Sequence, residues 1–304
     1  MAAAGLSLHI GLNTVDPARY DGWDGRLAAC ENDAHDMAAL ARAAGFSDTV
    51  LLGADGTVEN VTAALRAAAD RLRDGDALLL TYSGHGGQVP DVTGADDEPD
   101  ALDETLVLYD RQFLDDELNR ELARCADGVR ILVLLDCCHS GSGIEVRELL
   151  TPEALDAQFG TADPAGIEAA SRLMPLVRQG AIYQRDKDFF QGLQRELRTG
   201  GGRPADAVLI SACQDNQLAS DGRVNGAFTG TLLDVWDRGA FRGDHRAFHR
   251  AILRRMPANQ SPNLHVSGRP PEAILRRMPA NQSPNLHVSG RPPEAFLAER
   301  PFTV

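Results

Sequence analysis

The sequence predicts an α/β fold in which a mostly parallel β-sheet is flanked by helices on both faces. Continuous apolar runs, typical of strands buried on both sides, recur along the chain and alternate with stretches of helical amphipathic periodicity. The apolar runs cover residues 6–13, 49–53, 77–82, 131–135 and 207–212, and the helical stretches cover residues 28–44, 58–73, 114–125, 228–238 and 245–255.

Turn signals separate these elements in chain order. Gly45 follows the first helical stretch, where a glycine commonly ends a helix, and Asp74-Gly75 follows the second. The strands divide the chain into a larger half over residues 1–143 and a smaller half over 206–304. Between them, residues 144–205 contain the loop signal TGGGRP, and we expect an insertion or linker there.

The segment ILRRMPANQSPNLHVSGRPPEA occurs twice without a change, at residues 252–273 and 274–295. Two copies of this length are too few for a solenoid. We expect one copy to complete the fold and the other to form a surplus loop, because loop insertions cost little.

Charge and composition exclude several classes of function. The net charge of −14 argues against nucleic acid and against an anionic membrane surface, and it suits cationic substrates. No apolar run is long enough to span a bilayer, and the start lacks the pattern of a secretory signal. Five cysteines without framework spacing fit a reducing compartment, so we expect a cytoplasmic protein. We also expect it to be a monomer.

Two motifs carry the chemistry. YSGHGGQ places His85 just after one apolar run, and LLDCCHSGSG places Cys137 and Cys138 just after another. The carboxyl ends of parallel strands meet at one edge of a sheet, which is where such folds bind ligands. A thiol nucleophile and a proton-transfer partner are therefore expected to meet there.

The chain resembles the metacaspases, which belong to the caspase-like clan of cysteine peptidases. The matching pieces follow in the family's order: LHIGLN, CENDAHDM, YSGHGGQ, DETLVLYD, DDEL, LLDCCHSGSG, LISACQDNQLA and NGAFTGTLL. The resemblance implies a caspase-like fold and a cysteine endopeptidase, of a compact prokaryotic type without a prodomain. The chain departs from the pattern at Cys137, where the family often has serine, and in the duplicated tail.

The resemblance assigns Cys138 as the nucleophile, because it directly precedes His-Ser-Gly, and His85 as the imidazolium that protonates the leaving amine. Cys137 is the alternative nucleophile. Side chains two apart on an extended segment share a side, so Asp136 and Cys138 would face one cleft while Cys137 points into the core. By analogy with the clan, the backbone N–H groups of Gly86 and Cys138 would bind the oxyanion.

The resemblance also implies a substrate pocket lined by Asp33, Ser83 and Asp136, with Cys30 at its edge. Two carboxylates in one pocket favour arginine or lysine, since guanidinium groups form bidentate charge-assisted bonds with them. The expected partners are therefore protein or peptide substrates with Arg or Lys before the scissile bond.

Many metacaspases bind calcium, and the matching carboxylates here are Asp103, Asp115, Asp116 and Glu145. Clustered oxygens suit Ca²⁺, although the same acids could form a solvated loop.

We also expect autoprocessing in the linker, at one of the basic residues Arg178, Arg185, Lys187, Arg195, Arg198 and Arg203. The rival functions are a catalytically silent caspase-like interaction module and another Cys-His hydrolase such as an amidase.

Overall fold

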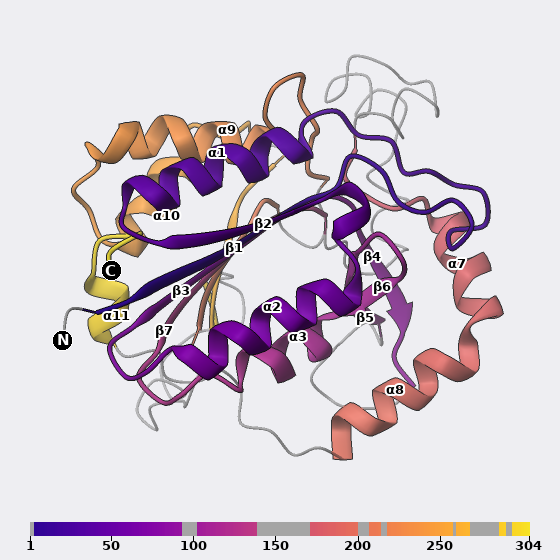
Figure 1. The fold of residues 1–304 in the computed structure, drawn as a ribbon. Coiled ribbons are helices and arrows are strands. Elements are labelled where there is room, and N and C mark those ends of the chain that lie inside the picture. The colour runs from indigo at the N-terminus through magenta and orange to yellow at the C-terminus, as the bar shows by residue number, and fades with distance from the viewer. Residues whose placement is uncertain are drawn as a thin grey trace, which may run out of the picture.

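A computed structural model of the chain describes residues 3–92, 102–138, 171–199, 207–213, 218–257, 260–267, 286–289 and 294–304. These residues form a seven-stranded sheet covered by helices on both faces, with a separate three-stranded sheet beyond one end of it (Figure 1). The predicted class, a mostly parallel sheet between helical layers, is confirmed.

The large sheet has the strand order β10-β9-β8-β7-β3-β1-β2. Every pairing is parallel except that between β8 and β9. The strands are β1 (Gly5–Gly11), β2 (Ser47–Leu52), β3 (Ala77–Ser83), β7 (Arg130–Asp136), β8 (Ala207–Ser211), β9 (Asn263–Ser267) and β10 (Leu286–Ser289).

Two helical layers cover this sheet. Helices α1 (Cys30–Ala43), α9 (Ala227–Trp236) and α10 (His245–Leu253) lie on one face, and α2 (Val58–Arg71) and α3 (Asp115–Leu122) lie on the other (Figure 1). The described residues also form the short helix α11 (Glu294–Ala298) and the 3₁₀ turns Gly53–Asp55 and Asp237–Gly239.

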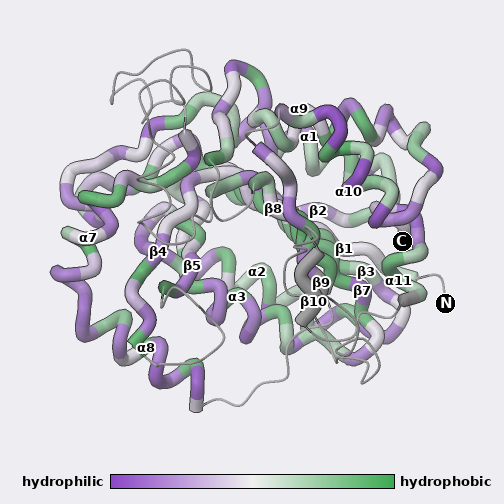
Figure 2. The backbone as a smooth tube through the Cα atoms, turned by 180° about the vertical axis from the view of Figure 1, so that it is seen from behind, coloured by the Kyte–Doolittle hydropathy of each residue, from purple (hydrophilic) through white to green (hydrophobic). Residues whose placement is uncertain are grey.

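The central strands bury both of their faces, as their continuous apolar runs predict. Along β7, Ile131 and Val133 pack in the cluster under α2 and α3, while Leu132 and Leu134 pack in the cluster under α1 and α9. Figure 2 shows these strands as a green, hydrophobic centre of the molecule. Because side chains alternate in this way, Asp136 at the end of β7 lies on the α1 and α9 side.

The sequence patterns did not predict the small antiparallel sheet of β4 (Gly86–Pro90), β5 (Leu102–Val107) and β6 (Gln112–Leu114). The interval expected to be an insertion or linker contains two helices, α7 (Leu176–Arg185) and α8 (Lys187–Thr199), which lie beside this sheet (Figure 1). The small sheet matters for the site, because β4 begins at the residue that follows His85.

Both copies of the duplicated segment contribute a strand. The first copy supplies β9, and the second supplies β10, which pairs with β9 so that identical residues face each other: Leu286 with Leu264 and His287 with His265. The second copy is therefore not simply the surplus loop that the sequence suggested. Two identical segments have the same β propensity. The second can therefore form a strand at the edge of the sheet beside the first.

Candidate active site

A buried polar pocket lies at the carboxyl ends of β3 and β7. Ser83 ends β3 and pairs in register with Asp136, which ends β7. The Ser83 hydroxyl donates to Oδ2 of Asp33, in the first turn of α1, at 2.6 Å. Adjacent strands and the helix that covers them thus bring together three side chains that are far apart in the sequence. We call this group of side chains, together with Asp221, the specificity pocket, after the role proposed for it below.

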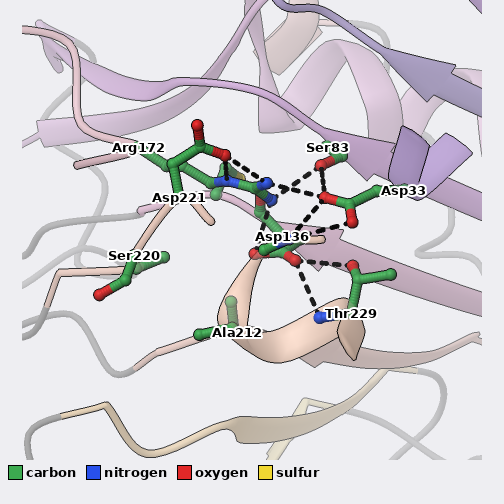
Figure 3. A network of polar contacts seen from close by, with 12 residues as sticks. Asp33, Ser83, Asp136, Arg172, Ala212, Ser220, Asp221 and Thr229 are labelled. Atoms are coloured by element: carbon green, nitrogen blue, oxygen red, sulfur yellow. Dashed lines mark hydrogen bonds and ion pairs between the residues drawn. The ribbon is translucent and has the colours of Figure 1, made fainter. Parts of the chain in front are cut away.

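The specificity pocket is filled by a side chain of the same molecule, the fully buried Arg172 (Figure 3). Its Nη2 lies 2.7 Å from Oδ2 of Asp33 and 2.9 Å from Oδ1 of Asp221. Its Nη1 lies 2.7 Å from Oγ of Ser83 and 2.9 Å from Oδ1 of Asp136. A single guanidinium is therefore surrounded by three carboxylates and a hydroxyl.

Helix α9 and the turn before it hold the carboxylates in place. Thr229 donates to Oδ2 of Asp136 through its backbone N–H at 2.9 Å and its hydroxyl at 2.6 Å. The N–H of Gly226 donates to Oδ1 of Asp33 at 3.1 Å. A Cβ on Gly226 would lie only 2.5 Å from Cζ of Arg172, so glycine leaves the room that the guanidinium occupies.

Sequence reasoning missed Asp221, Thr229 and Arg172. Thr229 lies within the motif NGAFTGTLL, and Asp221 follows LISACQDNQLA by two residues, so their motifs were visible while their roles were not. Arg172 lies in no motif. Only the path of the folded chain identifies it as the arginine that reaches the pocket.

Burial and charge act against each other in the specificity pocket. Burial raises the pKa of Asp33 to about 6, although the nearby Arg172 charge acts to lower it. Burial alone would lower the pKa of Arg172, but the charges of Asp136 and its neighbours raise it well above its usual value. The pair is thus ionised at neutral pH. Cys30 lies at the pocket wall, and burial raises the pKa of its thiol to about 12.

The backbone of Arg172 lies between two segments of the motifs. Its carbonyl oxygen accepts hydrogen bonds from the N–H groups of Gly86, at 2.9 Å, and Cys138, at 3.2 Å. Its own N–H donates to the carbonyl of Ala219 at 3.0 Å. A Cβ on Gly86 would collide with the backbone oxygen of Cys138, so only glycine permits this close approach. Two N–H groups therefore converge on the carbonyl of the Arg172–Leu173 peptide bond.

The two adjacent cysteines face opposite sides of the sheet. Cys138 belongs to the cluster under α1 and α9, and Cys137 belongs to the cluster under α2 and α3. The sulfur of Cys138 accepts the N–H of Ala219 at 2.9 Å, and Ala219 also binds the N–H of Arg172. Burial raises the pKa of Cys137 well above its usual value, which keeps that thiol protonated.

His85 is held in one orientation. Its Nε2 lies 3.0 Å from the carbonyl oxygen of Gly25, and its ring packs on Trp23 with centroids 4.8 Å apart. A carbonyl only accepts hydrogen bonds, so Nε2 carries the proton and Nδ1 of the neutral ring is an acceptor. Burial lowers the pKa of His85 to about 4. Burial therefore favours the neutral ring over the imidazolium that the resemblance implies, while the hydrogen bond to Gly25 acts in the opposite direction.

The acids considered for calcium lie at the small sheet and α3. Burial and the charges of Asp116, Glu104 and Asp103 raise the pKa of Asp115 well above its usual value. Asp103 accepts a hydrogen bond from Nε2 of Gln194 at 2.7 Å. Among the residues that the structure describes, no three His, Cys, Asp or Glu side chains are grouped to ligate a metal, and Glu145 lies outside those residues.

A thiol, a histidine held with one free ring nitrogen, and two N–H groups converging on a carbonyl are features of a cysteine peptidase site. This site lies at the carboxyl ends of a mostly parallel sheet. The chain belongs to the caspase family of cysteine peptidases: the family model described as the caspase domain matches residues 14–288.

The curated relatives are metacaspases. Metacaspase-1 of Mycosarcoma maydis is 30% identical over 259 residues, which cover 76% of this chain and 62% of that protein. Metacaspase-1 of Coccidioides immitis is 30% identical over 250 residues, 74% of this chain and 52% of that protein. The chain thus spans between about half and three-fifths of the length of these relatives.

Solved structures agree on the fold. The protein GSU0716 from Geobacter sulfurreducens is 40% identical with a TM-score of 0.78, over 99% of both chains. Caspase-1 from Spodoptera frugiperda aligns over 86% of both chains with a TM-score of 0.53 at 12% identity, which supports the caspase-like fold alone. In the described part of the chain, no helix has the length and apolar character needed to cross a membrane.

Proposed function

We propose that this protein is a cysteine endopeptidase that cuts peptide bonds after arginine or lysine, with Cys138 as nucleophile and His85 as proton carrier. The observation that supports this most directly is Arg172, whose guanidinium fills the specificity pocket while its carbonyl oxygen accepts from the N–H groups of Gly86 and Cys138. The same residue thus presents a basic side chain and a polarised peptide bond at a thiol, as a substrate would.

The proposed reaction follows from the neutral state of His85. Nδ1 takes the proton of the Cys138 thiol as the sulfur attacks the carbonyl carbon of the substrate's arginine. The N–H groups of Gly86 and Cys138 stabilise the oxyanion. The C–N bond then breaks as Nδ1–H passes its proton to the leaving nitrogen. Water hydrolyses the thioester, which releases a carboxylate and restores the thiol.

The shape of the specificity pocket favours arginine over lysine. Nε and Nη2 of the guanidinium both lie within 3.3 Å of Oδ1 of Asp221, and Nη1 reaches Ser83. A lysine ammonium is a single nitrogen on a more flexible stem and cannot satisfy all of these acceptors at once. We therefore expect both residues to be accepted, with arginine preferred.

Self-cleavage is part of this proposal, at the bond between Arg172 and Leu173. The sequence pointed instead to six basic residues further along the linker. Arg178, Arg185, Lys187, Arg195 and Arg198 lie in helices α7 and α8, where the backbone is already hydrogen-bonded, and Arg203 lies outside the described residues. Arg172, in contrast, directly precedes Leu173, which forms a β-bridge with Gly86.

Mass spectrometry of the incubated protein tests the proposal. We expect the wild type to yield a new N-terminus at Leu173, and Cys138→Ala to yield none while keeping its fold. Arg172→Gln should remove the cut, whereas the matched variant Arg178→Gln, on α7, should retain it.

Cys137→Ser should keep most peptidase activity, because the Cys137 thiol lies in the cluster under α2 and α3. A wild type that never cuts itself or Arg peptides would favour the silent interaction module.

Calcium stimulation is a further part of the proposal. Its support is the mutual repulsion of the acids near Asp115, which a divalent cation would relieve. The described residues do not form a three-ligand site, so no step of the reaction above uses the ion.

A further inference from the structure

Residues 173–199, which we call the arm, begin on the C-terminal side of the Arg172–Leu173 bond and continue through α7 and α8. The first two residues of the arm are buried: Leu173 is 9% exposed and Met174 is fully buried. The N–H of Met174 donates to the carbonyl of Gly86 at 2.8 Å. The arm therefore occupies the positions that a substrate would use on the C-terminal side of its scissile bond.

An apolar cluster fastens the arm to the body. Met174, Ile182 and Phe190 of the arm pack with Trp23 and Val89 of the body in one cluster. The cluster lies beside His85, because the Trp23 ring contacts the His85 ring at a tilt of 55°. Displacing the arm would expose these apolar side chains to water.

Two buried glutamines add directional contacts. Nε2 of Gln179, on α7, donates to the carbonyl of Met174 at 2.5 Å, and its Oε1 accepts the N–H of Gln88 in β4 at 2.8 Å. Nε2 of Gln194, on α8, donates to the carbonyl of Pro90 at 2.9 Å and to Asp103. The two glutamines thus connect the arm to the middle of β4, at Gln88, and to its last residue, Pro90.

None of these contacts passes through the Arg172–Leu173 bond. We propose that the arm stays bound after that bond is cut, and that the cut enzyme therefore acts on arginine substrates with a small leaving group but excludes polypeptides that continue past the scissile bond until the arm is displaced. This inference rests on the proposed peptidase function. Cutting would free the specificity pocket, because Arg172 could then leave it. Leu173 and Met174 would still cover the part of the site that binds substrate residues after the scissile bond.

The test compares two arginine substrates on the self-cut, full-length protein. One is a short peptide ending in arginine linked to a fluorogenic amine, and the other is a quenched peptide with four residues after arginine. For the wild type we expect kcat/KM for the short substrate to exceed that for the long one by at least tenfold. Ile182→Ser and the milder Gln179→Ala should reduce this ratio severalfold, because they loosen the arm.

Val177→Ser is the matched control, since Val177 lies on α7 but is 83% exposed. It should leave the ratio unchanged. Hydrogen exchange supplies a readout independent of turnover: amides of residues 174–199 should stay protected after the cut. Equal rates for the two substrates, or loss of that protection on cutting, would overturn the inference while leaving the peptidase function intact. Absence of any self-cut would overturn the inference, and only the additional absence of cleavage of arginine peptides would overturn the peptidase function.

Discussion

Two acidic regions of this molecule have opposite electrostatic balance. In the specificity pocket, three carboxylates surround the buried guanidinium of Arg172, which lies within 3 Å of each. In the second region, which we call the acidic cluster, Asp103, Glu104, Asp115 and Asp116 lie close enough that burial and the other three charges raise the pKa of Asp115. Both regions are acidic, but a guanidinium lies among the carboxylates of the first, whereas in the second the neighbouring carboxylates raise the pKa of Asp115.

The difference shows what carboxylate clustering by itself can imply. Carboxylates that converge on one cationic group with good geometry form a selective site, because charge-assisted hydrogen bonds depend on both the charge and the shape of that group. Carboxylates that mainly repel one another favour protonation or a counter-ion, without specifying which. The specificity pocket therefore supports a substrate class, while the acidic cluster supports only a general affinity for cations.

Removing one carboxylate from the specificity pocket should have the largest effect. Asp33→Asn leaves a buried guanidinium short of a partner, which costs about 3–5 kcal/mol. We expect kcat/KM for arginine peptides to fall by on the order of 10²- to 10⁴-fold. The reactivity of Cys138 toward a small alkylating agent should change little. Asp234→Asn, on the exposed side of α9, is the control, and an equal loss in both variants would contradict the pocket assignment.

Filling the pocket without changing its charge should have the next largest effect. The methyl group of Gly226→Ala would press on the guanidinium at a 2.5 Å separation from Cζ. Overpacking of this kind costs about 1–3 kcal/mol, so arginine cleavage should fall about 10- to 100-fold. Gly230→Ala on α9, whose Cβ would meet only an ordinary contact at 3.5 Å, should leave the rate near that of the wild type. Similar rates for both alanine variants would show that arginine does not enter here.

Acid should weaken the specificity pocket before it affects the histidine. Burial raises the pKa of Asp33 to about 6, so its carboxylate is lost as pH falls through that value. At pH 5 about one-tenth of the ionised form remains, and KM for arginine peptides should rise by up to about tenfold. The pKa of His85 is about 4, so kcat should change less between pH 7 and 5. Measured pH profiles of KM and kcat decide this, and Asp33→Asn should flatten the KM profile.

The acidic cluster should show the smallest effect. If calcium relieves its repulsion, millimolar calcium should raise wild-type activity a few-fold, and Asp115→Asn combined with Asp116→Asn should remove that response. Asp70→Asn, on an exposed position of α2, should retain it. Full wild-type activity in excess chelator, unchanged on adding calcium, would contradict this prediction.

Periodicity predicted much of the framework. The apolar run at 77–82 and the one at 131–135 became the adjacent strands β3 and β7, and the helical stretch at 28–44 became α1. The small sheet after His85 was missed, because β4 is glycine-rich and β6 has only three residues, too short to show a period. Helices α7 and α8 were missed because their amphipathic pattern lies in an interval bounded by loop signals.

The sequence by itself determined the fold class, the family motifs and the side chains that the two strand ends present, because local periodicity and motif order are properties of neighbouring residues. Tertiary structure alone decided that Arg172 enters the specificity pocket, that Asp221 joins it, and that burial lowers the pKa of His85. Arg172 lies 139 residues from Asp33. Its place depends on burial and on contacts between distant segments, and no local pattern encodes the path that brings them together.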